Sequence, residues 1–440
     1  MIFKFFVPFL MAALLSAPGF SQNINTAKLD SFFNVLSAKN KIMGSFAIAR
    51  NGQIVYKRSI GYSTENIPAS ENTLYHIGSI TKMFTATMIF QLIEEKKLSL
   101  NTTLDTWFPR IPNAKQITIA MLLSHRSGLF DFVNDESDKL WITKPHSKSE
   151  ILNTIITGKQ HFLPNSGFSY CNSGYALLTY VIENITGQPY NENLQKRICL
   201  KTGLKNTYSP VNNELKKNEA ASYSFTTKWE KDTEIYFPNI KGVGDILSTP
   251  ADLIVFNEAL LNGKLISLTS IQLMKPFNNE AFGMGLQKVP FYSHTGYGHG
   301  GDTYGTHSIV GDFVDDNLVI AYSINGEAYP HNDVSIGILS ICYNTKYEIP
   351  AFKGIAIPDE ILKKNIGVYS SAQIALKITV TVKGPVLFMQ ATGQPAFALD
   401  AVKNNLFKND AIGAVAEFNA GKNEMTLKQG GRTFLFSKDK

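Results

Sequence analysis

The sequence predicts an α+β fold followed by a small all-β domain. Two pairs of strand-forming segments lie far apart in the chain, within residues 44–63 and 305–325, and a long, mostly helical stretch separates them. This order indicates one sheet that is built from both chain ends and holds a helical insert. After about residue 345, short alternating segments between turn residues replace the helical patterns, which is typical of a small barrel-like β domain.

Composition sets the class of protein. The chain has 440 residues, enough for two or three domains, and a hydrophobic content of 44% that can fill their cores. Its net charge of +6 comes from Lys and Arg residues scattered along the chain without a long basic run. This distribution argues against nucleic acid as a partner.

Residues 1–21 have the pattern of a secretory signal peptide. A positive charge precedes an apolar run, and Gly19 and Ser21 are small residues suited to cleavage before Gln22. The run is too short for a membrane anchor because Pro8 interrupts it, and no later segment is long and apolar enough to span a bilayer. We therefore expect a secreted or periplasmic mature protein with no membrane span.

The main domain, residues 22–345, begins and ends with strand signals. Residues 25–40 have helical apolar spacing, and Asn51 and Gly52 then separate two apolar runs. Asn-Gly in that position is the strongest short signal for a β-hairpin. A second hairpin is expected within residues 305–325, with its turn at an Asp-Asp-Asn sequence.

The insert between the hairpins has three further segments with helical apolar spacing. One of them ends at Gly187, where a C-cap glycine belongs. Another has Ser248 or Thr249 ahead of Pro250 at the first helical turn. The segments are residues 117–129, 173–187 and 248–263.

Residues 346–358, which contain two prolines, are expected to form a linker to the β domain of residues 359–440. The polar residues of that domain form no cluster with catalytic spacing, so it is interpreted as an accessory module.

Metal and cofactor motifs are not found in the sequence. The three cysteines, among them Cys171, are odd in number and widely spaced. We expect them to be small buried hydrophobic residues. His294, His299 and His307 lie in a glycine-rich turn and strand without a carboxylate partner at metal spacing. There is no H-E-x-x-H motif and no G-x-S-x-G nucleophile elbow. No metal and no cofactor are therefore expected.

Ser79 and Lys82 form the first candidate catalytic pair. Ser79 precedes a helix that we expect to be amphipathic, and positions i and i+3 of a helix lie on one face. A buried lysine with a lowered pKa can take the proton of a serine hydroxyl, and the helix N-terminus can stabilise an oxyanion. The alternative is a helix N-cap serine, since Ser-x-x-Lys is a common pattern that recurs at Ser437 and Lys440.

Two further motifs have residues with suitable chemistry. Tyr170 and Asn172 precede a helix, where the tyrosine could relay a proton and the asparagine could bind a substrate carbonyl and hold Lys82 in place. The alternative is a buried aromatic residue followed by an N-cap. His299 begins a His-Gly-Gly sequence that leads into a strand, and its alternative is a glycine-rich turn with an exposed histidine. In the functional interpretation, the glycines let a substrate lie against the strand, and the backbone N–H of the next residue completes an oxyanion hole with that of the serine.

The order of these three motifs resembles the serine β-lactamase and penicillin-recognising hydrolase superfamily, in particular class C β-lactamases, DD-peptidases and related esterases. The resemblance covers about residues 25–345 and includes the phrases LYHIGSITKMFTA, MLLSHRSGL, FSYCNSGYALL, GVGDILSTPADL and GYGHGGDTYG. It implies a β-lactamase/transpeptidase-like fold, with an antiparallel sheet flanked by helices. The C-terminal module resembles the small β domain of some esterases and aminopeptidases of this superfamily.

The resemblance also implies roles for individual residues. It makes Ser79 the acylated nucleophile, Lys82 its base partner and Tyr170 the acid/base tyrosine. The implied substrate-binding residues are Asn172, His299, Gly300 and Gly301, and the implied oxyanion hole consists of the backbone N–H groups of Ser79 and Asp302.

Departures from the family pattern bear on the substrate. His299 replaces a lysine that attracts a substrate carboxylate, and a histidine is mostly neutral at neutral pH. Cys171 replaces a more usual serine, and Asn165 a frequent glycine. We therefore expect an exported serine hydrolase that cleaves an ester or amide, including a D-amino-acid peptide, through an acyl-enzyme. The alternatives are a β-lactamase or DD-carboxypeptidase, and a non-catalytic cell-wall or peptide-binding protein. The sequence does not define the oligomeric state.

Overall fold

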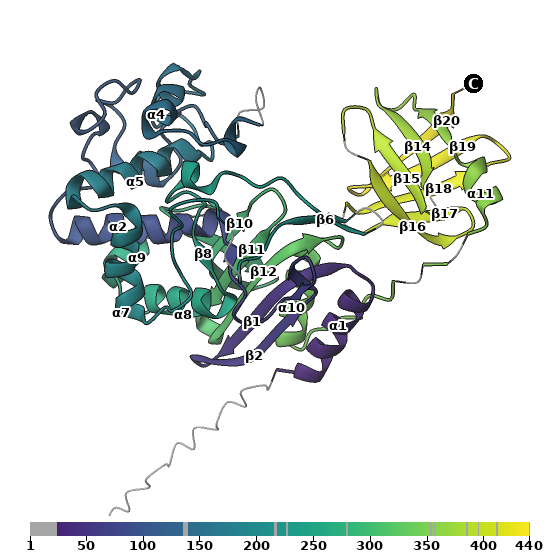
Figure 1. The fold of residues 1–440 in the computed structure, drawn as a ribbon, viewed down its shortest axis with the longest axis horizontal. Helices are drawn as coiled ribbons and strands as arrows, with labels where there is room; N and C mark the ends of the chain where they lie inside the picture. The colour runs from purple at the N-terminus through teal and green to yellow at the C-terminus, as the bar shows by residue number, and fades with distance from the viewer. Residues whose placement is uncertain are drawn as a thin grey trace, which may run out of the picture.

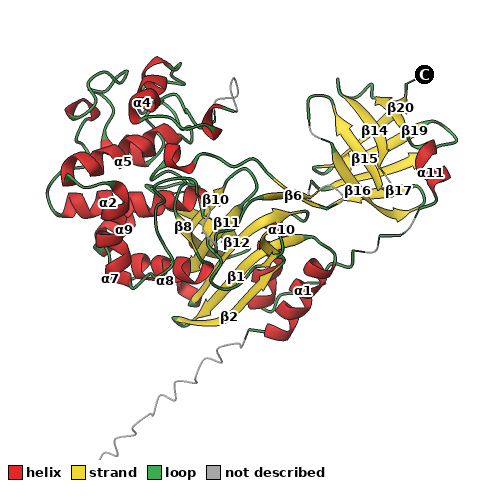
Figure 2. Cartoon of the chain, in the orientation of Figure 1, coloured by secondary structure: helices red, strands yellow, loops and turns green. Residues whose placement is uncertain are grey.

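The computed structural model describes residues 24–134, 140–214, 218–225, 228–278, 280–352, 354–355, 357–383, 386–394, 396–410 and 412–439. The expected signal peptide lies outside the described residues. Figure 1 shows a mixed domain of helices and strands beside an all-β barrel, and Figure 2 separates their helices from their strands. The expected α+β domain with a following small β domain is therefore confirmed.

Both chain ends of the main domain contribute strands to one sheet, as the sequence predicts, and the strands of its main path are antiparallel. β1 (Ile42–Arg50) lies between β2 (Gln53–Ile60) and β12 (Leu318–Glu327), so early and late strands are hydrogen-bonded neighbours. Beyond β12 the order continues through β11 (His307–Phe313) and β10 (His294–Asp302) to β9 (Gln287–Phe291).

The period of two along β1 divides its side chains between two cores. Phe46 and Ile48 belong to a core with α1 (Thr26–Ala38) and α10 (His331–Cys342). Ala47 and Ala49 belong to the core of the opposite face, which includes α8 (Pro250–Leu261) and the helical insert. Adjacent side chains of a strand point to opposite faces, so both faces of the sheet are covered.

The hairpin and cap signals correspond to the expected elements. Asn51 and Gly52 connect β1 to β2, with φ of 53° and 73°, and a turn with two positive φ values suits the twist of a hairpin. Gly187 ends α5 (Asn172–Thr186) with φ of 66°. The Thr249 side chain accepts a hydrogen bond from the backbone N–H of Asp252 and caps α8.

The helix that follows Ser79 differs from the sequence prediction. A 3₁₀ turn, η1 (Gly78–Ile80), contains the serine, and α2 (Thr81–Glu94) follows it. Every residue of α2 from Thr81 to Leu92 is buried, so the helix is not amphipathic. Sheet, α8 and α5 surround it on different sides, and Phe84 stacks on Phe256 of α8 with ring centroids 3.6 Å apart. A helix that is buried on all faces is typical of a domain centre.

The remaining helices belong mainly to the insert. They are η2 (Leu104–Thr106), α3 (Ile119–Leu123), η3 (Trp141–Thr143), α4 (Lys148–Thr157), α6 (Tyr190–Leu194), the π-helical turn η4 (Gln195–Cys199), α7 (Leu200–Thr202), η5 (Phe237–Ile240), α9 (Leu268–Met274), η6 (Val314–Asp316) and α11 (Asp359–Lys364). The short strands are β3 (Tyr62–Thr64), β4 (Ile67–Pro68), β5 (Tyr75–His76), β6 (Tyr223–Phe225), β7 (Trp229–Lys231) and β8 (Leu247–Ser248). Within the described residues, no helix combines the length and the apolar character that crossing a membrane requires.

The C-terminal β domain is a closed barrel with strands in sequence order. Its strands are β13 (Gly367–Ser370), β14 (Lys377–Lys383), β15 (Val386–Ala391), β16 (Phe397–Lys403), β17 (Leu406–Asn409), β18 (Ala414–Asn419), β19 (Glu424–Gln429) and β20 (Arg432–Lys438). β13 pairs with β20, which closes the sheet and removes its edges. Side chains such as Val380, Phe407 and Phe436 fill a separate core.

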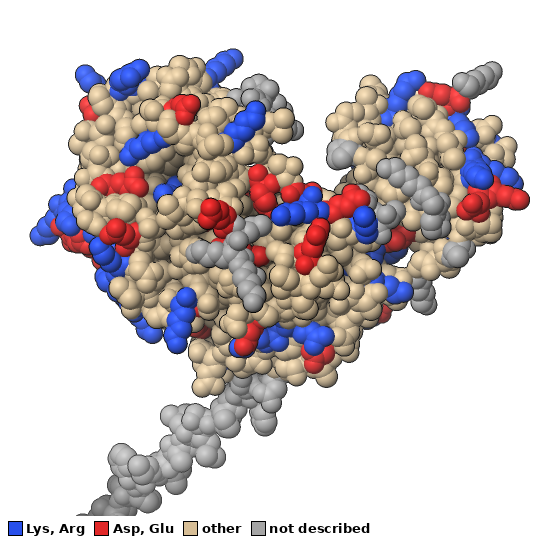
Figure 3. All heavy atoms as spheres, in the orientation of Figure 1, with Lys and Arg blue, Asp and Glu red and all other residues tan. Residues whose placement is uncertain are grey.

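Charges are spread over the molecule. Figure 3 shows Lys and Arg singly or in small groups among Asp and Glu on the visible face. The three cysteines are free and buried, as expected.

Candidate active site

The segment before α2 positions Ser79 beside the strand β10. The backbone N–H of Ile77 donates to Ile246 at 2.9 Å, so a loop from the insert fixes one side of the segment. On the other side, a Cβ atom at Gly301 would lie 2.0 Å from the Ile77 carbonyl oxygen and 2.8 Å from the Ser79 nitrogen. Only glycine at position 301 allows this approach.

Lys82 lies one turn after Ser79, and its ammonium group points at the serine. Lys82 Nζ is 2.9 Å from Ser79 Oγ and 2.9 Å from the carbonyl oxygen of Val243. The lysine is fully buried, and burial lowers its pKa to about 7, although the negative charge of Asp131 opposes this decrease. Near neutral pH a large fraction of Lys82 is therefore unprotonated and able to accept a proton. The N-cap alternative for Ser79 is not observed, since Ile80 occupies that position.

The loop that presents Val243 is held by a buried carboxylate. Asp245 accepts a hydrogen bond from the backbone N–H of Gly242 at 2.7 Å and another from the Ser209 hydroxyl. Burial raises the pKa of Asp245 to about 6, against these hydrogen bonds. The carbonyl partner of Lys82 thus belongs to an ordered loop within GVGDIL, a phrase whose individual residues had no assigned role in the sequence.

Tyr170 lies next to Lys82, with its ring centroid 4.9 Å from Lys82 Nζ. Its hydroxyl is buried and has no hydrogen-bond partner among the described residues. Burial raises the pKa of Tyr170 above its usual value, and Ser79 is close enough to offset part of this increase, without the geometry of a hydrogen bond. The hydroxyl is thus a proton donor or acceptor that is free for a substrate or for Ser79.

Asn172 is the first residue of α5, and its side-chain amide donates to Asp131 at 2.9 Å. The structure gives no bond from Asn172 to Lys82, so the expectation that the asparagine holds the lysine is wrong. Serine and carbonyl groups are the hydrogen-bond partners of Lys82 instead.

Two site residues were missed in the sequence. Asp131 is buried and accepts hydrogen bonds from Asn172, Asn134 and the backbone N–H of Val133. His125 stacks on Tyr170 with ring centroids 4.3 Å apart. Both residues lie in or just after the phrase HRSGL, which supported the family resemblance without a role for its residues.

His125 has a defined tautomer. Its Nδ1 accepts a hydrogen bond from the backbone N–H of Cys171 at 3.0 Å, so the proton is on Nε2. Burial, together with the nearby Lys82 and His299, lowers the pKa of His125 well below its usual value. A neutral His125 therefore packs under Tyr170 and orients its ring.

His299 is 3% exposed and faces the same cavity from β10. Burial lowers its pKa to about 4, against the effect of the Gly300 carbonyl group that bonds its Nδ1. The side chain is therefore neutral at physiological pH. The alternative interpretation, an exposed histidine in a turn, is wrong.

The backbone nitrogens expected to form an oxyanion hole lie on facing segments. A Cβ atom at Gly78 would be 2.7 Å from the Asp302 nitrogen, and one at Gly301 would be 2.8 Å from the Ser79 nitrogen. Adjacent N–H groups on an ordered turn and a strand suit the stabilisation of an oxyanion.

These groups meet around one cavity of about 390 Å³. Ser79, Tyr170, Asn172, His299, Gly300 and Asp302 all line it, together with apolar residues such as Phe282 and Ile240. Lys82 lies behind Ser79, and Gly301 contributes the close contact between β10 and η1. The sequence-predicted residues thus come together in one place.

One expectation about histidines is wrong. His294 Nδ1 lies 2.9 Å from Asp316, and His307 has carboxylates at both ring nitrogens, Asp302 at 2.7 Å and Glu327 at 3.1 Å. The contact with Glu327 could not be predicted from spacing along the chain, because β12 places that residue near β11 only after the sheet has formed.

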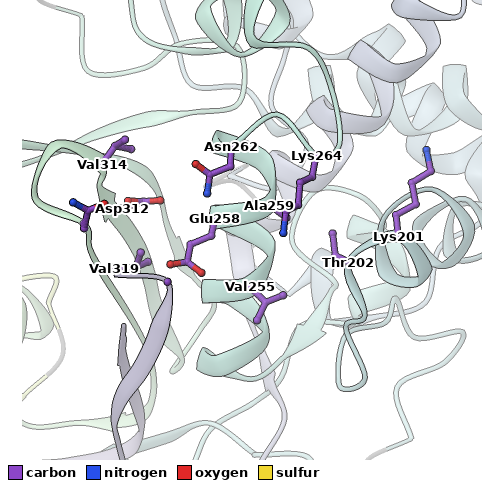
Figure 4. Close-up of a pocket in the computed structure, with 12 residues that line it drawn as sticks. Lys201, Thr202, Val255, Glu258, Ala259, Asn262, Lys264, Asp312, Val314 and Val319 are labelled. Carbon is purple, nitrogen blue, oxygen red and sulfur yellow. The ribbon is translucent and has the colours of Figure 1, made fainter. Parts of the chain in front are cut away.

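A second cavity, of about 310 Å³, lies between α8 and the sheet and contains none of the predicted site residues. Figure 4 shows Glu258 and Asp312 on its wall, with Lys264 nearby. It lacks a nucleophile with an adjacent base, so the first cavity is the candidate active site.

Comparison with known proteins identifies the family. A family model described as Beta-lactamase matches residues 29–339. The chain belongs to the beta-lactamase family. The expected β-lactamase/transpeptidase-like fold and the assignment as a serine hydrolase are thereby confirmed.

Relatives of this beta-lactamase family chain have different names. Penicillin-binding protein 4* of Bacillus subtilis is 28% identical over 433 residues, which cover 90% of this chain and 94% of the relative. Teichoic acid D-alanine hydrolase of Staphylococcus aureus is 30% identical over 243 residues, covering 53% of this chain and 55% of the relative.

Solved structures repeat the same architecture. A D-amino acid amidase from Ochrobactrum anthropi, complexed with D-phenylalanine, has a TM-score of 0.64 and 25% identity, covering 73% of this chain and all of that chain (100%). An octameric penicillin-binding protein homologue from Pyrococcus abyssi has a TM-score of 0.66 at 24% identity and covers 94% of this chain and 100% of its own. At that identity it supports the fold alone.

Proposed function

We propose that this protein is an exported serine hydrolase that forms an acyl-enzyme on Ser79 from esters or amides of D-amino acids with a free α-amino group. The hydrogen bond of 2.9 Å between Ser79 Oγ and the buried Lys82 Nζ carries the proposal. A serine hydroxyl becomes a useful nucleophile only when a neighbouring base takes its proton.

In acylation, Ser79 Oγ attacks the carbonyl carbon while its proton passes to the neutral amine of Lys82. The carbonyl oxygen becomes an oxyanion, which the backbone N–H groups of Ser79 and Asp302 stabilise. When the intermediate collapses, the bond to the leaving oxygen or nitrogen breaks. The leaving group takes the proton from Lys82 through the Tyr170 hydroxyl, which has no other partner among the described residues.

Deacylation reverses these roles with water. A water molecule attacks the ester carbon of the acylated Ser79 and gives its proton to the base formed by Lys82 and Tyr170. The bond to Ser79 Oγ then breaks, the serine regains a proton and the free acid leaves.

The charge of the cavity supports the substrate class. Its wall has no Lys or Arg among the described residues, and His299 is neutral because it is buried. Although partial burial acts in the opposite direction, the hydrogen bond from His307 and the nearby histidine charges lower the pKa of Asp302, so this residue is anionic at neutral pH. An anionic wall attracts an ammonium group and disfavours a carboxylate.

Two comparisons support a D-aminoacyl donor. One relative is a teichoic acid D-alanine hydrolase, and one solved neighbour is a D-amino acid amidase complexed with D-phenylalanine. Export rests on the signal-peptide pattern of residues 1–21.

The test compares substrates that differ only in the charge of the α-amino group or in the chirality of the Cα atom. We expect the mature protein to hydrolyse D-alanine p-nitroanilide, and to act at least about tenfold more slowly on its N-acetylated form and on the L-enantiomer. A stable acyl adduct should be found on the Ser79 peptide by mass spectrometry, and Ser79→Ala should abolish both signals with an unchanged circular dichroism spectrum.

Other outcomes assign the protein differently. Rapid acylation by a fluorescent penicillin, without turnover of the amino-acid anilide, would make it a β-lactamase or DD-carboxypeptidase. Failure of penicillin and fluorophosphonate probes to label Ser79 would make it a binding protein.

A further inference from the structure

Two imidazoles and two carboxylates meet at the ends of three neighbouring strands, beside the active-site cavity. Asp302 ends β10, His307 begins β11, Glu327 ends β12 and His331 begins α10. His307 Nδ1 is 2.7 Å from Asp302 Oδ1, and His307 Nε2 is 3.1 Å from Glu327 Oε2. His331 Nδ1 is 2.9 Å from the same Glu327 oxygen.

The backbone fixes these four side chains in place. Asp302 and His307 are a cross-strand pair of β10 and β11. Glu327 and His331 are four residues apart, and the hydroxyl of buried Tyr322 donates to the His331 carbonyl oxygen at 2.8 Å. Ligands on strands and on a helix start are held more precisely than ligands on loops.

The ligand atoms are close enough to share one ion. One atom each of Asp302, His307 and His331 lie within 4.8 Å of one another. Imidazole nitrogen and carboxylate oxygen are ligands of Zn²⁺, which accepts four of them in a tetrahedron. We propose that Asp302, His307 and His331 form a site for one divalent transition-metal ion, with Zn²⁺ as the preferred ion and a fourth position open to water. Glu327 is not a ligand in this site: its carboxylate accepts hydrogen bonds from the other ring nitrogens, Nε2 of His307 and Nδ1 of His331, and so orients both imidazoles toward the ion.

The charge of the group suits a dication. With neutral imidazoles the group has two negative charges, and Asp333 is close enough to act on His331. A dication such as Zn²⁺ neutralises both carboxylates at once. The cysteines, which could compete for zinc, are buried elsewhere.

Metal binding has a consequence at the active site, which rests on the proposed function. Asp302 lines the cavity, and its backbone N–H lies beside Gly78. Coordination neutralises the Asp302 carboxylate, so the preference for an ammonium-bearing substrate falls. Binding itself does not depend on catalysis.

The test is calorimetric titration of Zn²⁺ into the metal-free full-length protein without a polyhistidine tag, in the Ser79→Ala background so that turnover plays no part. We expect one Zn²⁺ per chain and a raised melting temperature. His331→Asn and Glu327→Gln should each weaken binding at least about tenfold. His294→Asn is the matched control, because it removes a surface histidine that has one carboxylate partner, Asp316.

Three results would overturn the site. They are no binding to the parent protein, equal binding by the double variant His307→Asn/His331→Asn, and an equal loss in the His294→Asn control. Melting curves of the metal-free variants show whether each is folded, and tetrahedral Co²⁺ absorption that disappears in the folded His331→Asn variant gives a second readout. If Zn²⁺ binds but D-alanine p-nitroanilide is not hydrolysed, the metal site stands and the proposed function fails.

Discussion

Lys82 combines burial with two oxygen partners, and its protonation controls the nucleophile. Burial lowers its pKa to about 7. The Val243 carbonyl oxygen can accept a hydrogen bond from either the ammonium or the amine form. Ser79 gains a base only when the lysine has lost its proton, so the pH of the medium sets the active fraction.

The first prediction concerns this titration. With substrates that do not titrate in the range, kcat/KM should fall roughly tenfold for each pH unit below about 7 and become constant above it, because only unprotonated Lys82 accepts the serine proton. Steady-state kinetics from pH 5 to pH 9 measures this profile. A rate that stays constant down to pH 5 would show that Lys82 is not the base.

The second prediction tests whether the charge of Asp131 affects the pKa of Lys82. The Asp131 charge raises the pKa of Lys82, so Asp131→Asn should lower it and move the profile to lower pH by about 0.5 to 1 unit. The rate also falls, since the substitution alters the acceptor of the Asn172 amide. Asp359→Asn, at an exposed position of α11, is the control and should leave the profile in place. An unchanged midpoint in Asp131→Asn contradicts the electrostatic link.

Strand β10 must approach η1 closely for the site to exist, and the third prediction tests this contact between elements. Gly301→Ala places a Cβ atom 2.0 Å from the Ile77 carbonyl oxygen, so β10 or η1 must move. We expect a loss of stability of about 1 to 3 kcal/mol and a loss of kcat of about 10²-fold or more.

Gly300 provides the matched comparison for stability. A Cβ atom there meets only Gln287 Oε1 and Ser308 O, both at 3.9 Å, which is ordinary contact. In thermal unfolding, the melting temperature of Gly301→Ala should therefore be lower than that of Gly300→Ala, which should be near the wild-type value. Equal melting temperatures would mean that the contact between β10 and η1 is not tight.

The fourth prediction concerns the packing of α8 against the sheet. Asp312 of β11 is 5% exposed and lines the cavity in Figure 4. Burial raises its pKa to about 7, the charge of Glu258 adds to this increase and Lys275 opposes it. A carboxyl group whose pKa is higher in the folded state lowers stability as the pH rises from its unfolded value through about 7.

Asp312→Asn removes this cost at high pH and changes little at low pH. We expect the variant to be more stable than the wild type by about 2 to 4 kcal/mol at pH 8, and about equal at pH 4. Urea unfolding at the two pH values measures the difference. A variant that is less stable at pH 8 would show that the ionised carboxylate has a favourable partner.

Local signals explain which elements were predictable. Asn51 with Gly52, the C-cap Gly187 and the Thr249 cap act through neighbouring backbone, so the sequence defines them without tertiary contacts. Ser79 and Lys82 were also found because one helical turn brings them together.

Other features depend on tertiary structure. The burial of α2 on all sides arises from its place between sheet and insert, which periodicity cannot show. His125 and Asp131 reach the site only because the segment after α3 lies against the start of α5, where Cys171 and Asn172 bond them. Glu327 reaches His307 only across the sheet. A short phrase such as HRSGL marks such residues without revealing their roles.

At the scale of the whole molecule, the barrel has a core separate from the two cores of the main domain, which defines two folding units. Phe352 packs into the core under α1 and α10, whereas Ile357 packs into the barrel core. Between these units the described contacts include the ion pair of Lys41 with Asp400 and a backbone hydrogen bond of 3.0 Å from Ile355 to Ala401. In this ion pair the lysine is buried and the aspartate is half-exposed, and the backbone hydrogen bond starts from the segment that joins the two units.

The last prediction follows from this division. A fragment that ends at residue 352 keeps Phe352 and both faces of the sheet, so it should fold and retain kcat/KM within about threefold for a small substrate. Calorimetry of the full chain should resolve two unfolding transitions, and only the one assigned to the main domain should remain in the fragment. Loss of activity in a fragment with an unchanged main transition would mean that the barrel acts on the cavity directly. A single transition in the full chain would instead show that the main domain and the barrel unfold together.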